Sequence, residues 1–308
     1  MMRYIASRTA IALLSLMAIS LAVFGLLHLD AATPAAAILG IRHDTPANIA
    51  ALNRAMGLNL PVPVQYAHWL STFTRPHGAG TRILLGNLPV TLELLGLGMG
   101  FSLLLGAWVA LYQVQRPGSR GEKALTAATY IMSAVPGFWL AIILVWIFTL
   151  NFLWLPPPGP PLPDQMGFWW WARFETLPVA TIALTTVGYW SRQFRSALEE
   201  ALRSEYVRTA RAKGLPERRI PYRHVLRNAV LPLIALAGLS LPNALNTVIA
   251  VEVIFYLPGA GRLLINSVNG LFFTTATSVA MVLALVTVGA NWLADISYSL
   301  IDPRIEYH

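Results

Sequence analysis

Six long apolar runs limit what this chain can fold into. They cover about residues 9–29, 89–113, 124–153, 177–198, 229–251 and 277–301. A helix of roughly 20 apolar residues crosses the hydrocarbon core of a bilayer, and only helices and closed barrels satisfy their backbone hydrogen bonds there. Barrel strands read as short alternating segments, which these runs are not. The sequence therefore predicts an all-α polytopic membrane protein with six transmembrane helices.

The first run has a second interpretation. Arg3 and Arg8 precede its apolar core, as they do in a secretory signal peptide. The core is longer than the apolar region of a typical signal peptide. We therefore expect it to be retained as a span.

The distribution of basic residues predicts the orientation. Only 12% of the residues are charged, against about 25% in soluble domains, and the net charge is +8. Lys and Arg gather at the N-terminus, in the 114–123 loop, in the 192–228 segment and in the tail. Cytoplasmic loops of membrane proteins carry this excess. Both termini are therefore expected in the cytoplasm. The orientation of the protein in the membrane accounts for the net positive charge, so nucleic-acid binding is not needed to explain it.

The predicted outer loops carry interfacial signals. In the 30–87 loop, residues 45–58 and 61–73 are expected to form short helices near the outer interface, a region that suits Tyr66 and Trp69. The 153–174 segment is rich in Pro and ends in "FWWWARF", which is typical of a lipid anchor.

Several kinds of chemistry find no support in the sequence. There is no Cys, and no phosphate-binding G-x-x-x-x-G-K-[ST] loop. The six His are scattered (His28, His43, His68, His77, His224 and His308). We expect no metal site and no cofactor in this chain, and a membrane enzyme is disfavoured.

The basic segment at about 204–222 has an unusual pattern. Nothing breaks a helix before Gly214, and Glu205 and Arg208 are spaced to form an ion pair. Gly214 followed by Pro216 ends the helix, and a second short helix can begin at Pro216. The result is an elbow along the predicted inner surface. Two interpretations stay open, a basic loop that contacts phospholipid and an elbow that docks a partner.

The elbow and other segments resemble a known family. "EYVRTARAKGL" (205–215) and "RHVLRNAVLP" (223–232) resemble the cytoplasmic "EAA" loop of ABC-importer permeases of the dipeptide/oligopeptide/nickel group. Further similar stretches follow in the same order along the chain: 56–70, 88–94, 135–156, 251–264 and 291–305. The resemblance implies the MetI-like permease fold of type I importers, in the first permease of a heterodimer in a bacterial inner membrane.

The resemblance also implies partners and site residues. Two ATPases, which use ATP and Mg²⁺, would bind below, and a substrate-binding protein would dock outside. The ATPase-coupling residues would be Glu205, Tyr206, Arg208, Thr209, Ala210, Arg211, Ala212, Lys213 and Gly214. Residues 1–87 would form the first helix with its outer loop, and residues 88–302 the five-helix permease core.

Polar residues in or near the spans are candidates for the translocation path. They are Glu93, Tyr189, Asn243, Asn246, Glu252 and Asn291. Charge within a membrane is costly and marks functional sites, so Asp295 also belongs among the acidic candidates. Packing between helices is the alternative role for the Asn residues.

The substrate stays open between peptides, which we favour, and nickel or a metal chelate. Three outer segments depart from the family pattern, at 30–37, 74–87 and 269–278. A membrane scaffold that transports nothing is the alternative from another class.

Overall fold

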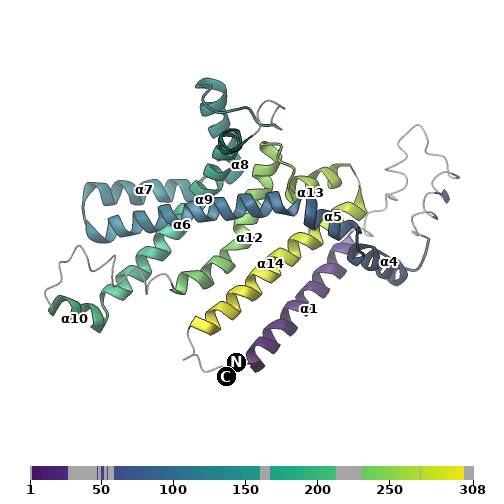
Figure 1. The fold of residues 1–308 in the computed structure, drawn as a ribbon, viewed down its shortest axis with the longest axis horizontal. Coiled ribbons are helices and arrows are strands. Elements are labelled where there is room, and N and C mark those ends of the chain that lie inside the picture. Colours follow the sequence, from purple (N-terminus) through teal and green to yellow (C-terminus); the bar gives the residue numbers. More distant parts are fainter. Residues whose placement is uncertain are drawn as a thin grey trace. The chain divides into compact units, whose positions relative to one another are not determined.

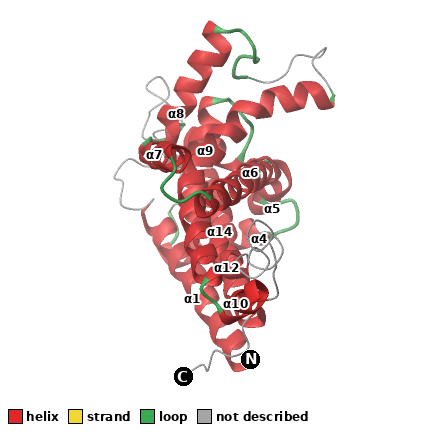
Figure 2. Cartoon of the chain, turned by 90° about the vertical axis from the view of Figure 1, so that its left-hand side faces the viewer, coloured by secondary structure: helices red, strands yellow, loops and turns green. Residues whose placement is uncertain are grey.

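The computed structural model describes residues 2–26, 47, 50–51, 54, 59–159, 167–212, 231–270 and 272–301. Within these residues the chain forms helices and loops and contains no strand (Figure 2). The all-α prediction is confirmed for this part of the chain. The helices are α1 (Met2–Leu26), α4 (Val62–Thr74), α5 (Ala79–Gly86), α6 (Leu88–Gln115), α7 (Arg120–Ala134), α8 (Gly137–Leu144), the π-helical η1 (Val145–Asn151), α9 (Phe168–Leu202), α10 (Glu205–Ala212), α12 (Leu231–Ile254), α13 (Ala260–Asn269) and α14 (Phe273–Ile301) (Figure 1).

These helices overlap all six predicted ranges. Among the described residues, four helical segments are long and apolar enough to cross a membrane: Tyr4–Gly25, Val62–Gln115, Leu236–Ile254 and Thr274–Ser297. The pair α7 and α8–η1 is a fifth candidate if it counts as one span. The multi-pass class is therefore supported, whereas six spans and cytoplasmic termini stay predictions.

Helix α9 is not among those candidates. Its centre carries three threonines. Thr181, Thr185 and Thr186 lie there, and each hydroxyl donates a hydrogen bond to the carbonyl four residues earlier, at 2.7–2.9 Å. Such bonds satisfy hydroxyls without a partner outside the helix. The composition of α9 therefore does not prevent its burial among other helices.

The expectation of one continuous helix over 124–153 is wrong. Helix α7 ends at Ala134, Val135 has an extended backbone (φ −78°, ψ 125°), and α8 begins after Pro136 at an angle of 106°. Proline disfavours the helical conformation at the preceding residue and has no N–H to donate. The sequence "AVPG" therefore divides this segment into two helices.

Two compact units make up the chain. One comprises Ala6–Thr91 and Pro258–Gly289. Within it, the Ser20 and Tyr66 hydroxyls are 2.8 Å apart and join α1 to α4. The Thr91 hydroxyl accepts a hydrogen bond from the Ala260 N–H at the start of α13, at 2.9 Å.

Trp69 packs helix α4 against α1 in this unit. Helix α4 forms over nearly all of the predicted 61–73 range, and the Trp69 side chain is buried. Its place at the outer membrane interface stays a prediction. Its centroid lies 5.9 Å from that of Phe24 in α1 and 5.7 Å from that of Phe73. Aromatic rings in this range of distances stabilise each other, so the Trp69 ring packs against α1. The expected helix over 45–58 lies almost entirely outside the described residues.

The other unit comprises Met1–Ile5, Leu92–Leu257 and Ala290–His308 and contains α7 to α12. Its helices approach closely where one of them carries glycine. A Cβ at Gly98 in α6 would lie 2.6 Å from the Ile182 Cβ, and one at Gly106 would lie 2.8 Å from the Trp190 Cβ. Small residues allow helices in membranes to pack at short range. Helices α6 and α9 are therefore held in a register that larger residues would not permit.

Candidate functional site

Helix α10 lies at the end of α9 and forms the described part of the predicted elbow (Figure 1). Its sequence contains no helix breaker, and Glu205 provides the acidic residue that a first helical turn favours. The helix predicted from residue 204 is thereby confirmed as far as Ala212. Lys213, Gly214 and the second helix from Pro216 lie outside the described residues.

The described side chains of α10 divide into an anchor and an exposed stripe. Val207 is fully buried, whereas Glu205, Arg208, Thr209 and Ala212 are exposed. The exposed four recur at helical spacing and share one face. Tyr206 flanks this stripe and is 40% exposed. An anchored helix with an open polar face is suited to docking a partner.

The predicted pairing of Glu205 with Arg208 is confirmed. Arg208 Nη1 donates to Glu205 Oε1 at 2.8 Å, and the two side chains are 71% and 84% exposed. Exposed pairs of this kind contribute only about 0–1 kcal/mol. The pair therefore sets the charge pattern of the stripe more than the stability of the helix.

The junction between α9 and α10 is a short hydrogen-bonded turn. The Arg203 N–H donates to the Glu200 carbonyl at 3.1 Å, and the Ser204 N–H donates to the Ala201 carbonyl at 3.2 Å. The Val207 N–H then donates to the Ser204 carbonyl at 3.1 Å. Few backbone dihedrals are free to absorb motion in such a turn. The connection between α9 and α10 is therefore only two residues long, Arg203 and Ser204.

The candidate path residues do not share one surface. Asn243 and Asn246 are exposed on α12, whereas Glu252 is fully buried on the opposite face of the same helix. Tyr189 is half-buried on α9, with its ring 5.1 Å from that of Trp190. Asn291 is half-buried on α14, and its Oδ1 has no hydrogen-bond partner among the described residues. The role of each stays a prediction.

Glu93 has a partner that the sequence did not indicate. Its Oε1 accepts a hydrogen bond from Trp171 Nε1 at 2.9 Å. Trp171 belongs to the "FWWWARF" segment, which was expected to anchor in lipid. Its ring is 40% exposed, so the indole combines an exposed ring with a polar bond to α6. The tryptophan run therefore contributes to packing between α6 and α9 as well.

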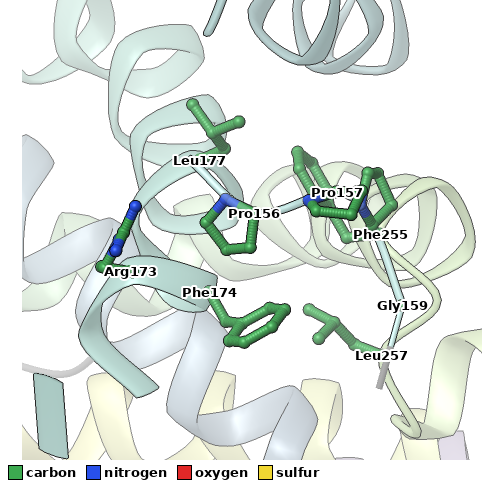
Figure 3. Close-up of a pocket in the computed structure, with 9 residues that line it drawn as sticks. Pro156, Pro157, Gly159, Arg173, Phe174, Leu177, Phe255 and Leu257 are labelled. Atoms are coloured by element: carbon green, nitrogen blue, oxygen red, sulfur yellow. The ribbon is translucent and has the colours of Figure 1, made fainter. Parts of the chain in front are cut away.

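A small pocket lies beside the Pro-rich segment (Figure 3). It is lined by Pro156, Pro157, Pro158, Gly159, Arg173, Phe174, Leu177, Phe255 and Leu257. Its volume is about 10 Å³, which is room for about one water molecule. The Arg173 guanidinium donates to the Trp154 carbonyl at 2.9 Å. The pocket is therefore too small for a peptide.

Among the described residues, no group of three or more His, Cys, Asp or Glu side chains is placed to hold a metal.

Comparison with protein families places the chain. Residues 102–307 match the model of the binding-protein-dependent transport system inner membrane component. Residues 1–81 match the model of the N-terminal part of such membrane components.

Individual relatives are similar over most of their length. The chain is 31% identical to the oligopeptide transport system permease protein AppB of Bacillus subtilis over 261 residues, which is 82% of this chain and 83% of that protein. It is 30% identical to the dipeptide transport system permease protein DppB of Alkalihalophilus pseudofirmus over the full length of both. It is 30% identical to the probable peptide ABC transporter permease protein y4tP of Sinorhizobium fredii over 99% of both. With the family models matching both the N-terminal segment and the region that contains α10, this chain belongs to the family of binding-protein-dependent transport system inner membrane components, the permease subunits of ABC importers.

Proposed function

We propose that this chain forms half of the translocation pathway of an ATP-driven importer of di- and oligopeptides. A second, homologous permease would supply the other half in a heterodimer in a bacterial inner membrane. Separate ATPases would bind on the cytoplasmic side, and a substrate-binding protein would deliver the peptide from outside. The similarity to an oligopeptide permease and a dipeptide permease supports peptides as the substrate class.

The observation that carries the proposal is the exposed stripe of α10. Val207 anchors the helix, the short turn connects it to α9, and Glu205, Arg208, Thr209 and Ala212 stay open to a partner. A lipid-contacting loop needs basic charge but neither a fixed helix face nor a stiff connection. The geometry therefore favours docking of a protein, and an ATPase is the partner that the family supplies.

A charge reversal in the stripe tests the docking. Arg208→Glu replaces the central cation of the stripe and removes the ion pair with Glu205. We expect uptake of labelled peptide to fall to background in cells that express the complete transporter, with unchanged amounts of the permease in the membrane. Arg120→Glu is the matched control, since Arg120 is an exposed arginine outside α10. Normal uptake by Arg208→Glu would contradict the docking.

Cross-linking gives direct evidence of proximity. The chain has no cysteine, so Thr209→Cys introduces a single thiol on the stripe. We expect it to cross-link to the ATPase, whereas Leu85→Cys, exposed on α5 in the predicted outer region, should not.

Thermal stabilisation of the cognate binding protein by peptides, and not by nickel or its chelates, would support the substrate class; the reverse result would favour the metal alternative.

A further inference from the structure

Arg195 joins two helices just before the elbow. Its Nη1 donates to Glu122 Oε1 of α7 at 2.8 Å, and its Nε donates to Glu199 Oε1 of α9 at 2.8 Å. The Glu122 side chain is only 12% exposed. Charge-assisted hydrogen bonds are stronger than neutral ones. The guanidinium fork can reach both carboxylates at once, which the single ammonium of lysine does less well.

The contact continues from α7 to α6. The Thr126 hydroxyl donates to the Glu122 carbonyl at 2.8 Å, and Gln113 Nε2 of α6 donates to the Thr126 hydroxyl at 2.9 Å. Gln113 is buried. The Ser119 hydroxyl accepts from the Glu122 N–H at 3.1 Å and caps the start of α7. A continuous polar chain therefore leads from α6 through the first turns of α7 to Arg195, and we call it the polar tie.

Helices α7 and α9 also touch at a second level. Gly188 of α9 faces Thr129 and Ser133 of α7, where a side-chain carbon would meet the Thr129 carbonyl and the Ser133 hydroxyl. The Arg192 guanidinium lies over the Tyr130 ring, 5.1 Å from its centroid. Two separated contacts oppose rotation of one helix against the other. The pair therefore behaves as one body as long as both contacts hold.

The polar tie lies close to the proposed docking helix. Leu202 ends α9 seven residues after Arg195, about 10 Å along the helix axis. The hydrogen-bonded turn follows, and α10 begins at Glu205. A force on α10 therefore reaches Arg195 through a short and stiff segment.

We infer that Arg195 is a positioning residue that transmits movement of α10 to α6 and α7. This inference rests on the proposed function. Arg195 holds the start of α7 against α9, so that a push of the ATPases on α10 moves the three helices together. Without the polar tie, α9 moves alone and hydrolysis proceeds without productive rearrangement of the pathway.

The coupling ratio tests this role. Arg195→Gln and Glu122→Gln are prepared in the complete transporter reconstituted in liposomes, and peptide transported per ATP hydrolysed is measured. We expect this ratio to fall about tenfold, the scale of one lost charge-assisted hydrogen bond, while the rate of ATP hydrolysis stays close to that of the parent and the protein still accumulates in the membrane. If Arg195→Gln does not accumulate, Glu122→Gln carries the test, since it keeps the bond between Arg195 and Glu199.

A matched control and a rescue separate positioning from folding. Glu200→Gln changes an exposed neighbour whose side chain makes no hydrogen bond or ion pair among the described residues, and it should leave the ratio unchanged. In the cysteine-free chain, Glu122→Cys with Arg195→Cys should be uncoupled before treatment. A short bifunctional thiol cross-linker should then restore the ratio, because it replaces the polar tie by a covalent one.

The outcomes are distinguishable from those of the docking test. A normal ratio in Arg195→Gln and Glu122→Gln, or no recovery on cross-linking, overturns the inference. If Arg208→Glu abolishes uptake in the same experiments, the proposed function is supported and only the inference about Arg195 fails. If Arg208→Glu also transports normally, the proposed function itself fails.

Discussion

Gly188→Ala is the change whose effect follows most directly from the geometry. Gly188 lies on α9 where α7 passes closest, and an added methyl group would meet the Ser133 hydroxyl and the Thr129 carbonyl oxygen. The Ser133 side chain can rotate away. The Thr129 carbonyl belongs to the backbone of α7 and cannot move without the helix. The substitution therefore pushes α7 away from α9.

The expected magnitude is a difference between two effects. Alanine in a helix interior is more stable than glycine by about 0.5–1 kcal/mol. Overpacking of a close contact costs about 1–3 kcal/mol. The net result is a loss of about 1–2 kcal/mol. In proteins of 150–250 residues each kcal/mol lowers the thermal midpoint by about 2–4 °C, so a decrease of about 2–8 °C is expected.

The assay compares two alanine variants in detergent. The fraction that stays monodisperse after heating is measured by size-exclusion chromatography for Gly188→Ala and for Gly100→Ala. A Cβ at Gly100 in α6 has no atom within 4 Å, so that variant should keep or slightly raise the midpoint. Equal midpoints for the two variants would refute the close contact between α7 and α9.

Three further substitutions have defined expectations. Ser119→Ala removes the N-cap of α7 and should cost about 1 kcal/mol, seen as a lower thermal midpoint. Val207→Ala removes two buried methyl groups at about 0.8 kcal/mol each and should speed hydrogen exchange of the α10 amides; unchanged exchange would mean that Val207 is no anchor. Trp171→Phe deletes the donor to Glu93 and should lower the midpoint more than Trp169→Phe, whose indole makes no hydrogen bond among the described residues.

Several features were predictable because local chemistry dictates them. The apolar runs predicted helices at every range because a bilayer requires long apolar helices. Helix α10 was predicted because residues 204–213 contain no breaker, and the pairing of Glu205 with Arg208 follows from their spacing. The family was recognisable because "EYVRTARAKGL" is a contiguous motif.

Other features were missed because they depend on residues distant in sequence. The ring contact between Phe24 of α1 and Trp69 of α4 joins residues 45 positions apart. Arg195 reads as one more basic residue of the 192–228 segment, although Glu122 lies 73 positions earlier. The break after Val135 was readable from Pro136, but the apolar run on both sides favoured one helix.

The sequence by itself determined the membrane class, the helical segments and helix α10, since each depends on the composition or spacing of neighbouring residues. Only the tertiary structure decided which helices pack together. It buried Glu252 and left Asn243 and Asn246 exposed on α12, and it joined Gln113, Glu122 and Arg195 across three helices. The physical reason is that a polar side chain in a helix bundle takes its role from the partner that packing provides, and no local pattern specifies that partner.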